Sequence, residues 1–131
     1  MVVCPGGLDL CNLTTPTVLS KVKFPGRNLH MHNSDICVLR TDIRENTAVG
    51  TLLMERLGRA SGPVELLVPE GGISENDRPG HVFYDSEADQ ALFTAIRDHA
   101  KPNVQTSWLP YHINDPAFAE IVAAKILDFL K

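Results

Sequence analysis

The chain has 131 residues, of which 44% are hydrophobic and 21% are charged, and its formal net charge is −4. A chain of this size and composition predicts one globular domain with a sizeable core. The sequence holds neither a basic cluster nor an apolar run long enough to cross a bilayer, which argues against nucleic-acid binding and against a membrane protein.

The cysteines and the N-terminal residues give expectations about the compartment. Cys4, Cys11 and Cys37 are an odd number of cysteines with no C-x-x-C pair, so a disulfide framework is not expected. Residues Met1–Gly7 lack the charged and apolar regions of a signal peptide. We therefore expect a cytoplasmic protein.

The first half of the chain carries the weaker secondary-structure signals. Met1–Cys4 predicts one strand, Leu8–Arg27 a turn or short helix followed by an extended crossing, and Asn28–His32 a second short strand. A helix is predicted after Thr41, because apolar residues then recur at helical spacing until a glycine-proline pair ends the pattern.

The second half is more regular. Val64–Val68 is an apolar run typical of a strand buried on both faces, and Val104–Leu109 predicts another strand. Between them, Ser86 and Asp89 predict a capping box at the start of a helix that ends at Lys101-Pro102.

The last predicted helix begins at Pro116, where the missing N–H of proline costs nothing, with Asp115 as its N-cap. The elements therefore alternate between strand and helix. This order predicts a single α/β domain over residues 1–131, a three-layer sandwich with a mainly parallel sheet of about four strands and about three main helices. The inward stripe of the last helix is predicted to be Phe118, Val122, Ile126 and Phe129.

Three polar, irregular segments occur where a strand is expected to end and a helix to begin: Asn33–Asn46, Glu70–Asp85 and His112–Pro116. Ligands of open α/β sheets bind outside the carboxyl ends of the strands. We therefore expect the three segments to meet at one site. The expected ligand-binding residues are Asn33, Arg40, Thr41, Gly71, Gly72, Ser74 and Asn114.

Each part of this site has a functional and a structural interpretation. The consecutive glycines Gly71 and Gly72 let backbone N–H groups approach an anion, but they also suit a plain surface loop or an oligomer contact. Arg40 and the helix start near Thr41 favour a phosphate or carboxylate, or they form a capped helix with a surface ion pair. His112 is an acid or base candidate, or a structural hydrogen-bonding residue.

Several familiar site motifs are missing. The chain has no Walker loop, no G-x-G-x-x-G dinucleotide motif and no G-x-S-x-G nucleophile motif. His30 and His32 share one face of a predicted strand, but no third ligand has a zinc-site spacing. We therefore expect no metal site.

A set of short stretches spread over nearly the whole chain resembles one known family. The resemblance is to the C-terminal half of the ATP-binding-domain family named after the tomato mosaic virus resistance protein, whose members are mostly uncharacterised bacterial and fungal proteins. The stretches are Gly6–Asp9, His32-Asn33, Arg40-Thr41, Glu45-Asn46, Gly72–Ser74, Asp77, Phe83–Asp89, Ala91–Phe93 and His112–Phe118.

The resemblance implies two Rossmann-like subdomains in a full-length member, of which this chain is similar to the second. It also implies nucleotide binding, with ATP and Mg²⁺ as cofactors in the full-length family, and self-association into dimers. The N-terminal subdomain would then be a further partner of this one. The resemblance assigns no nucleotide contact to any residue of this sequence.

Three hypotheses about function follow. The first is a binding module for a nucleotide or a phosphorylated small molecule at the carboxyl edge of the sheet. The second is a hydrolase- or lyase-like enzyme, in which His112 is the acid or base and Asp77 or Asp85 is a second polar group. The third is an oligomerisation or protein-interaction subdomain with no ligand of its own.

Overall fold

The computed structural model describes residues 1–13 and 17–130 and has the predicted α/β architecture. It contains two sheets of three strands each, one parallel and one antiparallel, together with four helices. The parallel sheet therefore has one strand fewer than we expected. Part of the segment predicted as an irregular crossing, residues 14–16, lies outside the described residues.

The parallel sheet consists of β1 (Val2–Val3), β5 (Val64–Pro69) and β6 (Val104–Leu109), in the order β1-β5-β6. The central strand β5 is buried almost throughout, as its continuous apolar sequence predicts. Its carboxyl end, and that of β6, point toward the loops that we expected to form the site, because parallel strands end at the same edge of a sheet.

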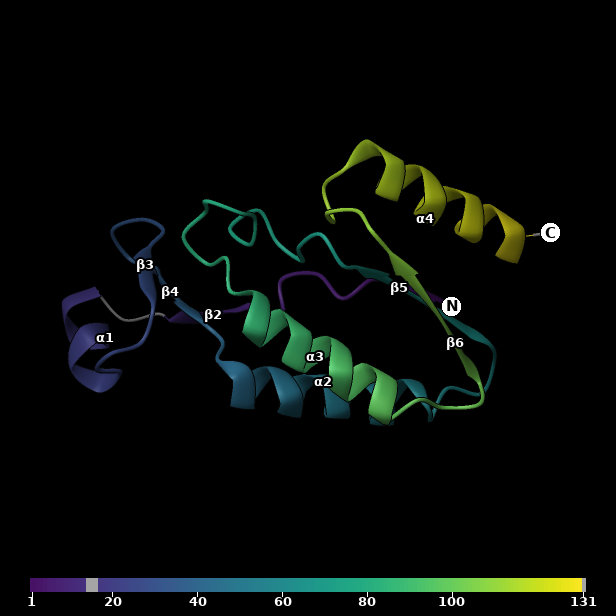
Figure 1. Ribbon diagram of the computed structural model, residues 1–131, viewed down its shortest axis with the longest axis horizontal. Coiled ribbons are helices and arrows are strands. Elements are labelled where there is room, and N and C mark those ends of the chain that lie inside the picture. Colours follow the sequence, from purple (N-terminus) through teal and green to yellow (C-terminus); the bar gives the residue numbers. More distant parts are fainter. Residues whose placement is uncertain (14–16, 131) are drawn as a thin grey trace.

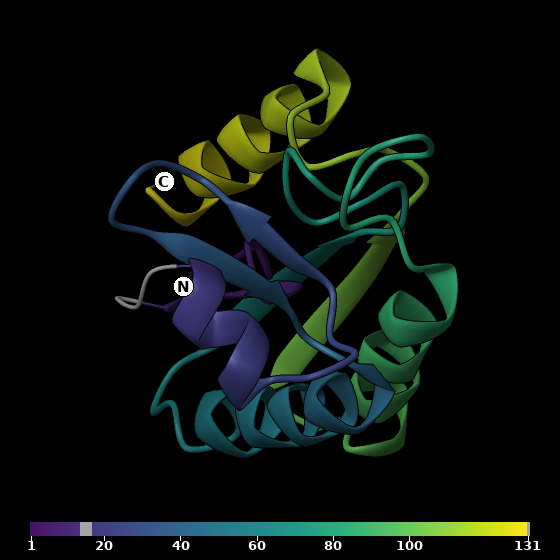
Figure 2. The same cartoon turned by 90° about the vertical axis from the view of Figure 1, so that its left-hand side faces the viewer.

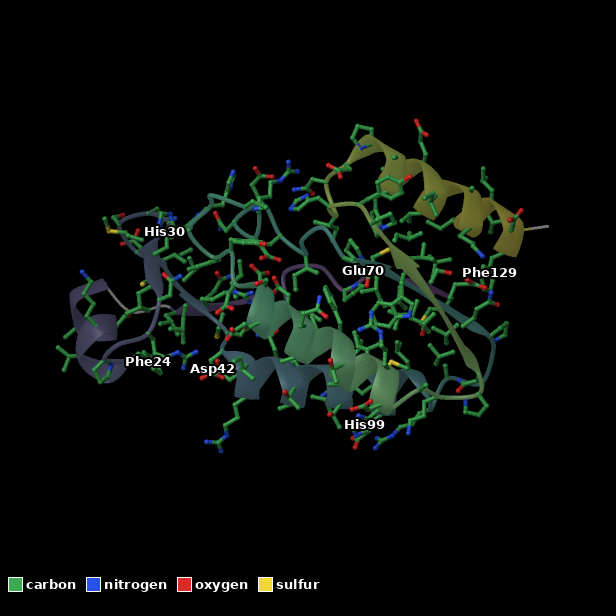
Figure 3. All side chains as sticks on the ribbon, viewed as in Figure 1. Phe24, His30, Asp42, Glu70, His99 and Phe129 are labelled. Atoms are coloured by element: carbon green, nitrogen blue, oxygen red, sulfur yellow. The ribbon has the colours of Figure 1, made fainter. Side chains whose placement is uncertain are left out.

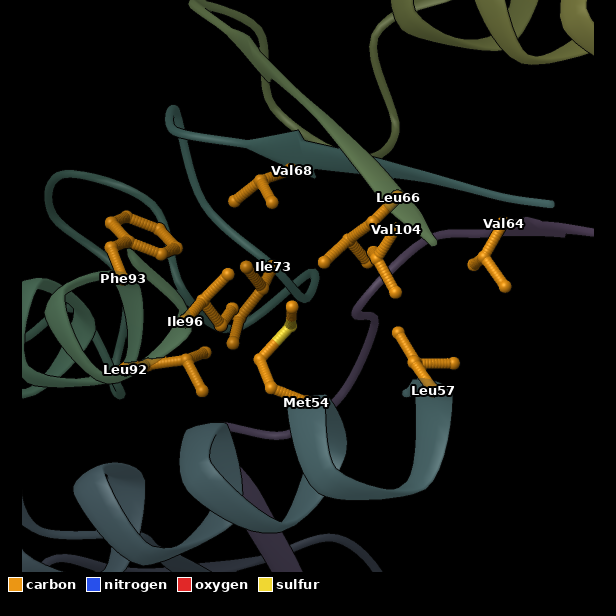
Figure 4. Close-up of a cluster of buried hydrophobic side chains, with 10 residues drawn as sticks. All are labelled: Met54, Leu57, Val64, Leu66, Val68, Ile73, Leu92, Phe93, Ile96 and Val104. Atoms are coloured by element: carbon orange, nitrogen blue, oxygen red, sulfur yellow. The ribbon is translucent and has the colours of Figure 1, made fainter. Parts of the chain in front are cut away.

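Helices cover both faces of this sheet. α2 (Ile43–Leu57) and α3 (Ser86–Asp98) pack side by side against one face, and α4 (Pro116–Phe129) lies on the other (Figures 1 and 2). The core lies between the sheet and the pair α2 and α3 (Figure 4). It comprises Met54, Leu57, Val64, Leu66, Val68, Ile73, Leu92, Phe93, Ile96 and Val104.

The antiparallel sheet contains β2 (Leu10–Leu13), β4 (Cys37–Arg40) and β3 (Leu29–Met31), with β4 in the centre. Together with the short helix α1 (Thr17–Lys23), it forms the end of the molecule that faces the viewer in Figure 2. The strand predicted at 28–32 therefore exists, but it pairs with β4 in this second sheet and does not join the parallel one.

The strand β4 corrects our interpretation of residues 33–46 as a polar strand-to-helix junction. All four of its residues are buried, and it pairs with β2 on one side and β3 on the other. Only the turn before β4 and the two residues between β4 and α2 are irregular. A strand of only four residues, which pairs with a neighbouring strand and with the more distant β2, leaves no periodic signal of its own.

The helix starts confirm some of the predicted caps and correct others. α2 begins with a capping box, in which Asp42 and Glu45 each bind the other's backbone N–H. At α3, the predicted capping box of Ser86 and Asp89 is wrong, because the N-cap is Asp85, which accepts a hydrogen bond from the Ala88 N–H. The side chain of Asp89 binds elsewhere.

α4 also differs from its prediction. Pro116 occupies the first turn as expected, but the Asp115 side chain makes no capping bond to the helix and instead accepts one from the His112 backbone N–H at 2.8 Å. Phe118 is buried, whereas Ile126 and Phe129 at the other end of the predicted inward stripe are 45% and 42% exposed. The C-terminal half of α4 thus extends beyond the surface that the sheet offers.

Candidate functional site

The loops at the carboxyl ends of β5 and β6 bind each other through their backbones. The Gly71 N–H donates to the Tyr111 carbonyl at 2.9 Å, and the Ile113 N–H donates to the Gly72 carbonyl at 3.0 Å. Two of the three predicted segments therefore meet directly. In Figure 3, Glu70 marks the place where β5 enters this region.

The two glycines are required by this close approach. A Cβ on Gly71 would lie 2.7 Å from the backbone of Tyr111 and His112, and a Cβ on Gly72 would lie 2.0 Å from the Asp77 carbonyl oxygen. Gly72 also has a φ of +127°, which L side chains rarely adopt. Packing between loops thus accounts for both glycines without any bound anion.

His112 is buried, and both of its ring nitrogens have partners. Nε2 lies 2.8 Å from the Ser74 carbonyl, and Nδ1 lies 2.8 Å from an Arg78 guanidinium nitrogen and 3.1 Å from the Asn114 N–H. These partners fit a neutral ring that donates from Nε2 and accepts at Nδ1. In this arrangement His112 fixes two loops together, and neither nitrogen faces an incoming molecule.

The two polar residues next to His112 are also engaged. Asn114 donates from its amide to the Glu75 carboxylate at 2.9 Å. The Ser74 hydroxyl donates to Asp9 Oδ2 at 2.6 Å, a contact that links the loop after β5 to the loop after β1. Both predicted ligand-binding residues therefore lie where the loops converge.

Arg40, at the end of β4, connects the third predicted segment to this region. The side chain is 3% exposed and donates to the backbone carbonyls of Phe83 at 2.7 Å, Asp9 at 3.2 Å and Asp85 at 3.3 Å. One of its nitrogens also binds Asp89 Oδ1 at 2.5 Å. These acceptors occupy most of the donors of the guanidinium. Arg40 therefore joins the antiparallel sheet to α3 and to the loop before it, and has little capacity left for a ligand.

The start of α2 matches the structural interpretation of a capped helix with an ion pair. The Thr41 hydroxyl donates to the Leu8 carbonyl and accepts from the Asn46 amide, each at 3.0 Å. Arg27 binds Glu45 of the capping box at 2.5 Å. Asp42, labelled in Figure 3, is the N-cap of this helix.

The remaining predicted residues lie in different places. Asp77 is fully buried and binds the Ile73 N–H through Oδ2 at 2.9 Å, whereas the Asp85 side chain caps α3. Asn33 lies in the exposed turn between β3 and β4, where its side-chain oxygen accepts from the N–H groups of Asp35 and Ile36. Gly71, Gly72, Ser74 and Asn114 therefore lie in loops that contact one another, and Arg40 is linked to them through Asp9, which Ser74 also binds. Thr41 binds Leu8 at the start of α2, and Asn33 lies in a separate turn.

Three buried carboxyl groups surround the Arg40 guanidinium. Asp9 and Asp77 are 0% exposed and Asp89 is 7% exposed. Arg40 Nη2 lies 2.5 Å from Asp89 Oδ1 and 3.9 Å from Asp77 Oδ1. Asp9 Oδ1 and Asp77 Oδ1 have no hydrogen-bond partner. If all three carboxyls were ionised, this group of residues would carry an excess of negative charge inside the protein.

Burial perturbs these carboxyl groups. Burial, and next the charge of Asp77, raise the pKa of Asp89 to about 7, against the opposing charge of Arg40. Burial also raises the pKa of Asp9, an effect that the Ser74 hydroxyl partly reverses. Asp89 is therefore partly protonated near neutral pH, which is unusual for a carboxyl group in a protein.

A cavity of about 250 Å³ lies next to Asp89, between the carboxyl end of β5 and the first turns of α3. This is the position at which α/β folds hold their ligands. The cavity is lined by Glu70, Gly71, Gly72, Pro79, Tyr84, Ser86, Asp89, Gln90 and Phe93.

The wall of the cavity is polar and aromatic but carries no lysine or arginine side chain. Two cations border this wall, and both are already paired. Arg40 binds Asp89 at 2.5 Å, and Arg97 binds Glu70 at 3.0 Å and lies over the Trp108 ring, 3.8 Å from its centre. Such a wall suits an uncharged or weakly cationic group of a ligand better than a multiply charged phosphate.

Sequence reasoning missed Asp9, Asp89 and the cavity residues of α3. Asp89 did carry a signal, since it lies three, four and seven positions before Leu92, Phe93 and Ile96, which places a carboxylate on the apolar face of α3. A charged residue on such a face requires a buried partner. Asp9 carried no comparable signal, because its burial depends on contacts with Ser74 and Arg40, which are remote in sequence.

Comparison with known proteins identifies the family. The model of a family described as "Uncharacterised protein family (UPF0261) C-terminal domain" matches residues 1–130. The chain belongs to the UPF0261 family. Among curated proteins, it is 41% identical over 121 residues to a UPF0261 protein of Mesorhizobium japonicum, which covers 91% of this chain and 30% of that protein.

Two further relatives extend the family. A UPF0261 protein of Clostridium tetani is 36% identical over 131 residues, with 99% of this chain and 32% of that protein covered. The ToMV resistance protein Tm-1 of Solanum lycopersicum is 35% identical over 130 residues, with 98% and 17% covered. The resemblance inferred from the sequence is thus confirmed, and the chain spans less than a third of the length of these relatives.

Two structural features are absent from residues 1–13 and 17–130. None of the helices in this part of the chain has both the length and the apolar character needed to cross a membrane. The same residues contain no group of three or more His, Cys, Asp or Glu side chains arranged to hold a metal ion.

Proposed function

We propose that this UPF0261 domain binds a small polar molecule, of the nucleotide or phosphorylated-metabolite class, at the carboxyl end of β5. The observation that carries the proposal is the cavity of about 250 Å³ between this strand end and α3. Its position follows the general rule for ligand sites in open α/β sheets. The tight backbone contacts of Gly71 and Gly72 support the proposal, because they make this wall of the cavity rigid before a ligand arrives.

The lining favours the nucleoside part of such a ligand over its phosphates. Tyr84 and Phe93 offer aromatic surface to a base, and Ser86, Gln90 and the Asp89 carboxyl offer partners for hydroxyl and amino groups. The volume is somewhat below the roughly 300 Å³ at which ligand pockets usually begin, so the cavity fits part of a nucleotide. The phosphates, with the Mg²⁺ expected for ATP, would lie outside the cavity.

Calorimetric titration with adenosine, AMP and ATP with Mg²⁺ tests this proposal. We expect heat of binding for adenosine and weaker binding for Gln90→Ala, which removes an amide from the cavity wall. The matched control is Gln105→Ala, because Gln105 is also an exposed glutamine but lines a different hollow at the opposite edge of the sheet. No heat with any of the three compounds at millimolar concentration, in this chain and in a full-length relative, would contradict the proposal.

The enzyme hypothesis that uses His112 has less support from the geometry. Both nitrogens of this ring bind groups of the protein itself, with contacts of 2.8 Å on each side. A general acid or base must reach the proton that it transfers. The cavity wall instead includes the carboxyl group of Asp89.

We propose, as a second candidate function, that the end of α4 forms an interaction surface with another copy of the chain. Ile126, Leu127, Phe129 and Leu130 are 45%, 60%, 42% and 77% exposed, which places four large apolar side chains on one short segment (Phe129 is labelled in Figure 3). Clusters of this kind often mark interfaces between proteins.

Light scattering over a range of concentrations tests the interaction surface. We expect dimers that dissociate in the Leu127→Glu variant. Ile43→Glu is the matched control, because Ile43 is 49% exposed at the start of α2, on the opposite side of the sheet. A strictly monomeric protein at high concentration, or equal effects of the two substitutions, would contradict this candidate function.

A further inference from the structure

We propose that Asp89 and Asp77 form a proton-sharing carboxyl pair that opens onto the cavity through Asp89 and exchanges a proton with a molecule bound there. The inference adds acid–base chemistry to the binding function proposed above. It depends on the same cavity, but it does not depend on the ligand being a nucleotide.

The geometry of the pair is set by Arg40. A single guanidinium nitrogen of this residue lies 2.5 Å from Asp89 Oδ1 and 3.9 Å from Asp77 Oδ1, so the two carboxyl groups converge on one point. When two carboxyl groups lie this close in a buried place, both cannot remain ionised, and they hold one proton between them.

The hydrogen bonds of Asp77 show where such a proton is needed. Asp77 is fully buried, and its Oδ2 accepts a hydrogen bond from the Ile73 N–H at 2.9 Å. Its other oxygen, Oδ1, has no hydrogen-bond partner and faces the same Arg40 nitrogen that holds Asp89. A buried oxygen without a partner is costly, and a proton on the Asp89 carboxyl supplies the missing donor.

The surrounding charges also favour a retained proton. Asp9, beyond Asp77, is a third buried carboxyl group, and Arg40 is the cation that the structure pairs with Asp77 and Asp89. On the cavity side, the charge of Glu70 is balanced by Arg97. One guanidinium therefore faces three carboxyl groups, and burial together with Asp77 raises the pKa of Asp89 to about 7.

The two members of the pair have different access to a ligand. Asp89 lines the cavity, whereas Asp77 is 0% exposed and does not. Asp89 is therefore the group that meets a bound molecule. Asp77 is a positioning residue, which acts through Asp89 by holding the shared proton. Because this proton is bound near neutral pH, the pair can act either as an acid or as a base.

A small epoxide probes this chemistry without knowledge of the natural ligand. An Asp89 carboxylate oxygen attacks the terminal ring carbon of glycidol, the ring C–O bond breaks, and the released oxygen takes the proton shared with Asp77. The product is an ester of Asp89 that carries two hydroxyl groups, and no oxidant or reductant takes part. The released oxygen can also take its proton from water, so ester formation alone does not identify the pair. A rate that depends on one ionised and one protonated carboxyl group passes through a maximum with pH, and this maximum reports the pair.

The experiment is peptide mapping by mass spectrometry after treatment of the wild-type protein with glycidol, at a series of pH values from about 5 to 9. We expect an ester at Asp89 whose rate of formation passes through a maximum and falls above a pH of about 7, as the shared proton is lost. In the Asp77→Asn variant the maximum is replaced by a plateau, because Asp89 then titrates alone. Asp98→Asn, which changes an exposed carboxylate of the same helix outside the cavity, leaves the maximum in place.

Two results would overturn the inference: no ester at Asp89 at any pH, or a rate in the wild type that rises to a plateau. The main readout is taken on the wild-type protein, so the test stands even if a variant does not fold. It is also independent of the nucleotide titrations. Failure of adenosine to bind would contradict the proposed function, but it would not affect the test of the carboxyl pair by glycidol.

Discussion

The substitution Asp89→Asn should make the protein progressively more stable than the wild type as the pH rises. Asparagine has the shape of a protonated aspartate but cannot ionise, so the two proteins are similar in acid. In the wild type the pKa of Asp89 changes from 3.8 to about 7 on folding. The folded protein therefore binds this proton more tightly than the unfolded chain, and the resulting stabilisation is complete below about pH 4 and is lost as the pH rises through about 7.

The size of this effect follows from the pKa values. A group that is protonated in the folded state and ionised in the unfolded state changes the free energy of unfolding by about 1.4 kcal/mol for each pH unit. Between about pH 4 and pH 7 the total is therefore about 4 kcal/mol. This figure is an upper limit, since Asp77 competes for the same proton.

Urea unfolding of both proteins at several pH values measures this difference, with fluorescence of the single tryptophan, Trp108, as the signal. Asp98→Asn serves as the control, because Asp98 is an exposed carboxylate on the same helix. For this control the difference from the wild type should stay constant above pH 5. A constant difference for Asp89→Asn as well, or a wild type that gains stability over the variant with rising pH, would refute the reasoning.

Three other outcomes are expected. Gly72→Ala should lower the free energy of unfolding, measured by urea titration, by more than about 3 kcal/mol, because the new Cβ meets the Asp77 carbonyl and the φ of this residue is positive. Gly62→Ala should change the free energy of unfolding little, because nothing lies within 4 Å of the new Cβ. His112→Ala should lower the melting temperature in calorimetry and reduce the free energy of unfolding by about 2–4 kcal/mol, because this ring joins two loops. An unchanged melting temperature would mean that the ring does not hold the loops together. An aromatic disulfide reagent should modify exposed Cys11 quickly and buried Cys37 only after unfolding, as a spectrophotometric time course would reveal.

The elements of the fold that the sequence predicted are those with a strong local pattern. β5 is an apolar run interrupted only by Glu65, and α2 and α3 place apolar residues at helical spacing, so their own residues specify them. β2, β3 and β4 are three or four residues long, and they form only because Leu10–Leu13 and Leu29–Met31 both pair with Cys37–Arg40. The pairing of β2 with β4 joins segments more than twenty residues apart, which is a tertiary effect that local periodicity does not record, whereas β3 and β4 form a short hairpin.

The same distinction applies to the site. The sequence predicted that the segments at the strand ends would meet, because parallel strands share an edge. The bonds of Gly71 to Tyr111, of His112 to Ser74 and of Arg40 to Phe83 agree with this expectation. The partner of each side chain could not be predicted. Asp89 was interpreted as a cap for its own helix, since Arg40, which binds it, is 49 positions away in the sequence.

The contacts of Arg40 also bear on why this protein has ionisable groups in its interior. Arg40 and Asp89 join the antiparallel sheet to α3, but a buried ion pair is weak evidence for stability, because apolar residues of similar volume often serve as well or better. Packing alone explains neither the third buried carboxyl group, Asp9, nor the oxygen of Asp77 that has no hydrogen-bond partner. The excess of carboxyl groups beside a cavity is accounted for if one of them has to hold a proton for a bound molecule, as we propose for Asp89.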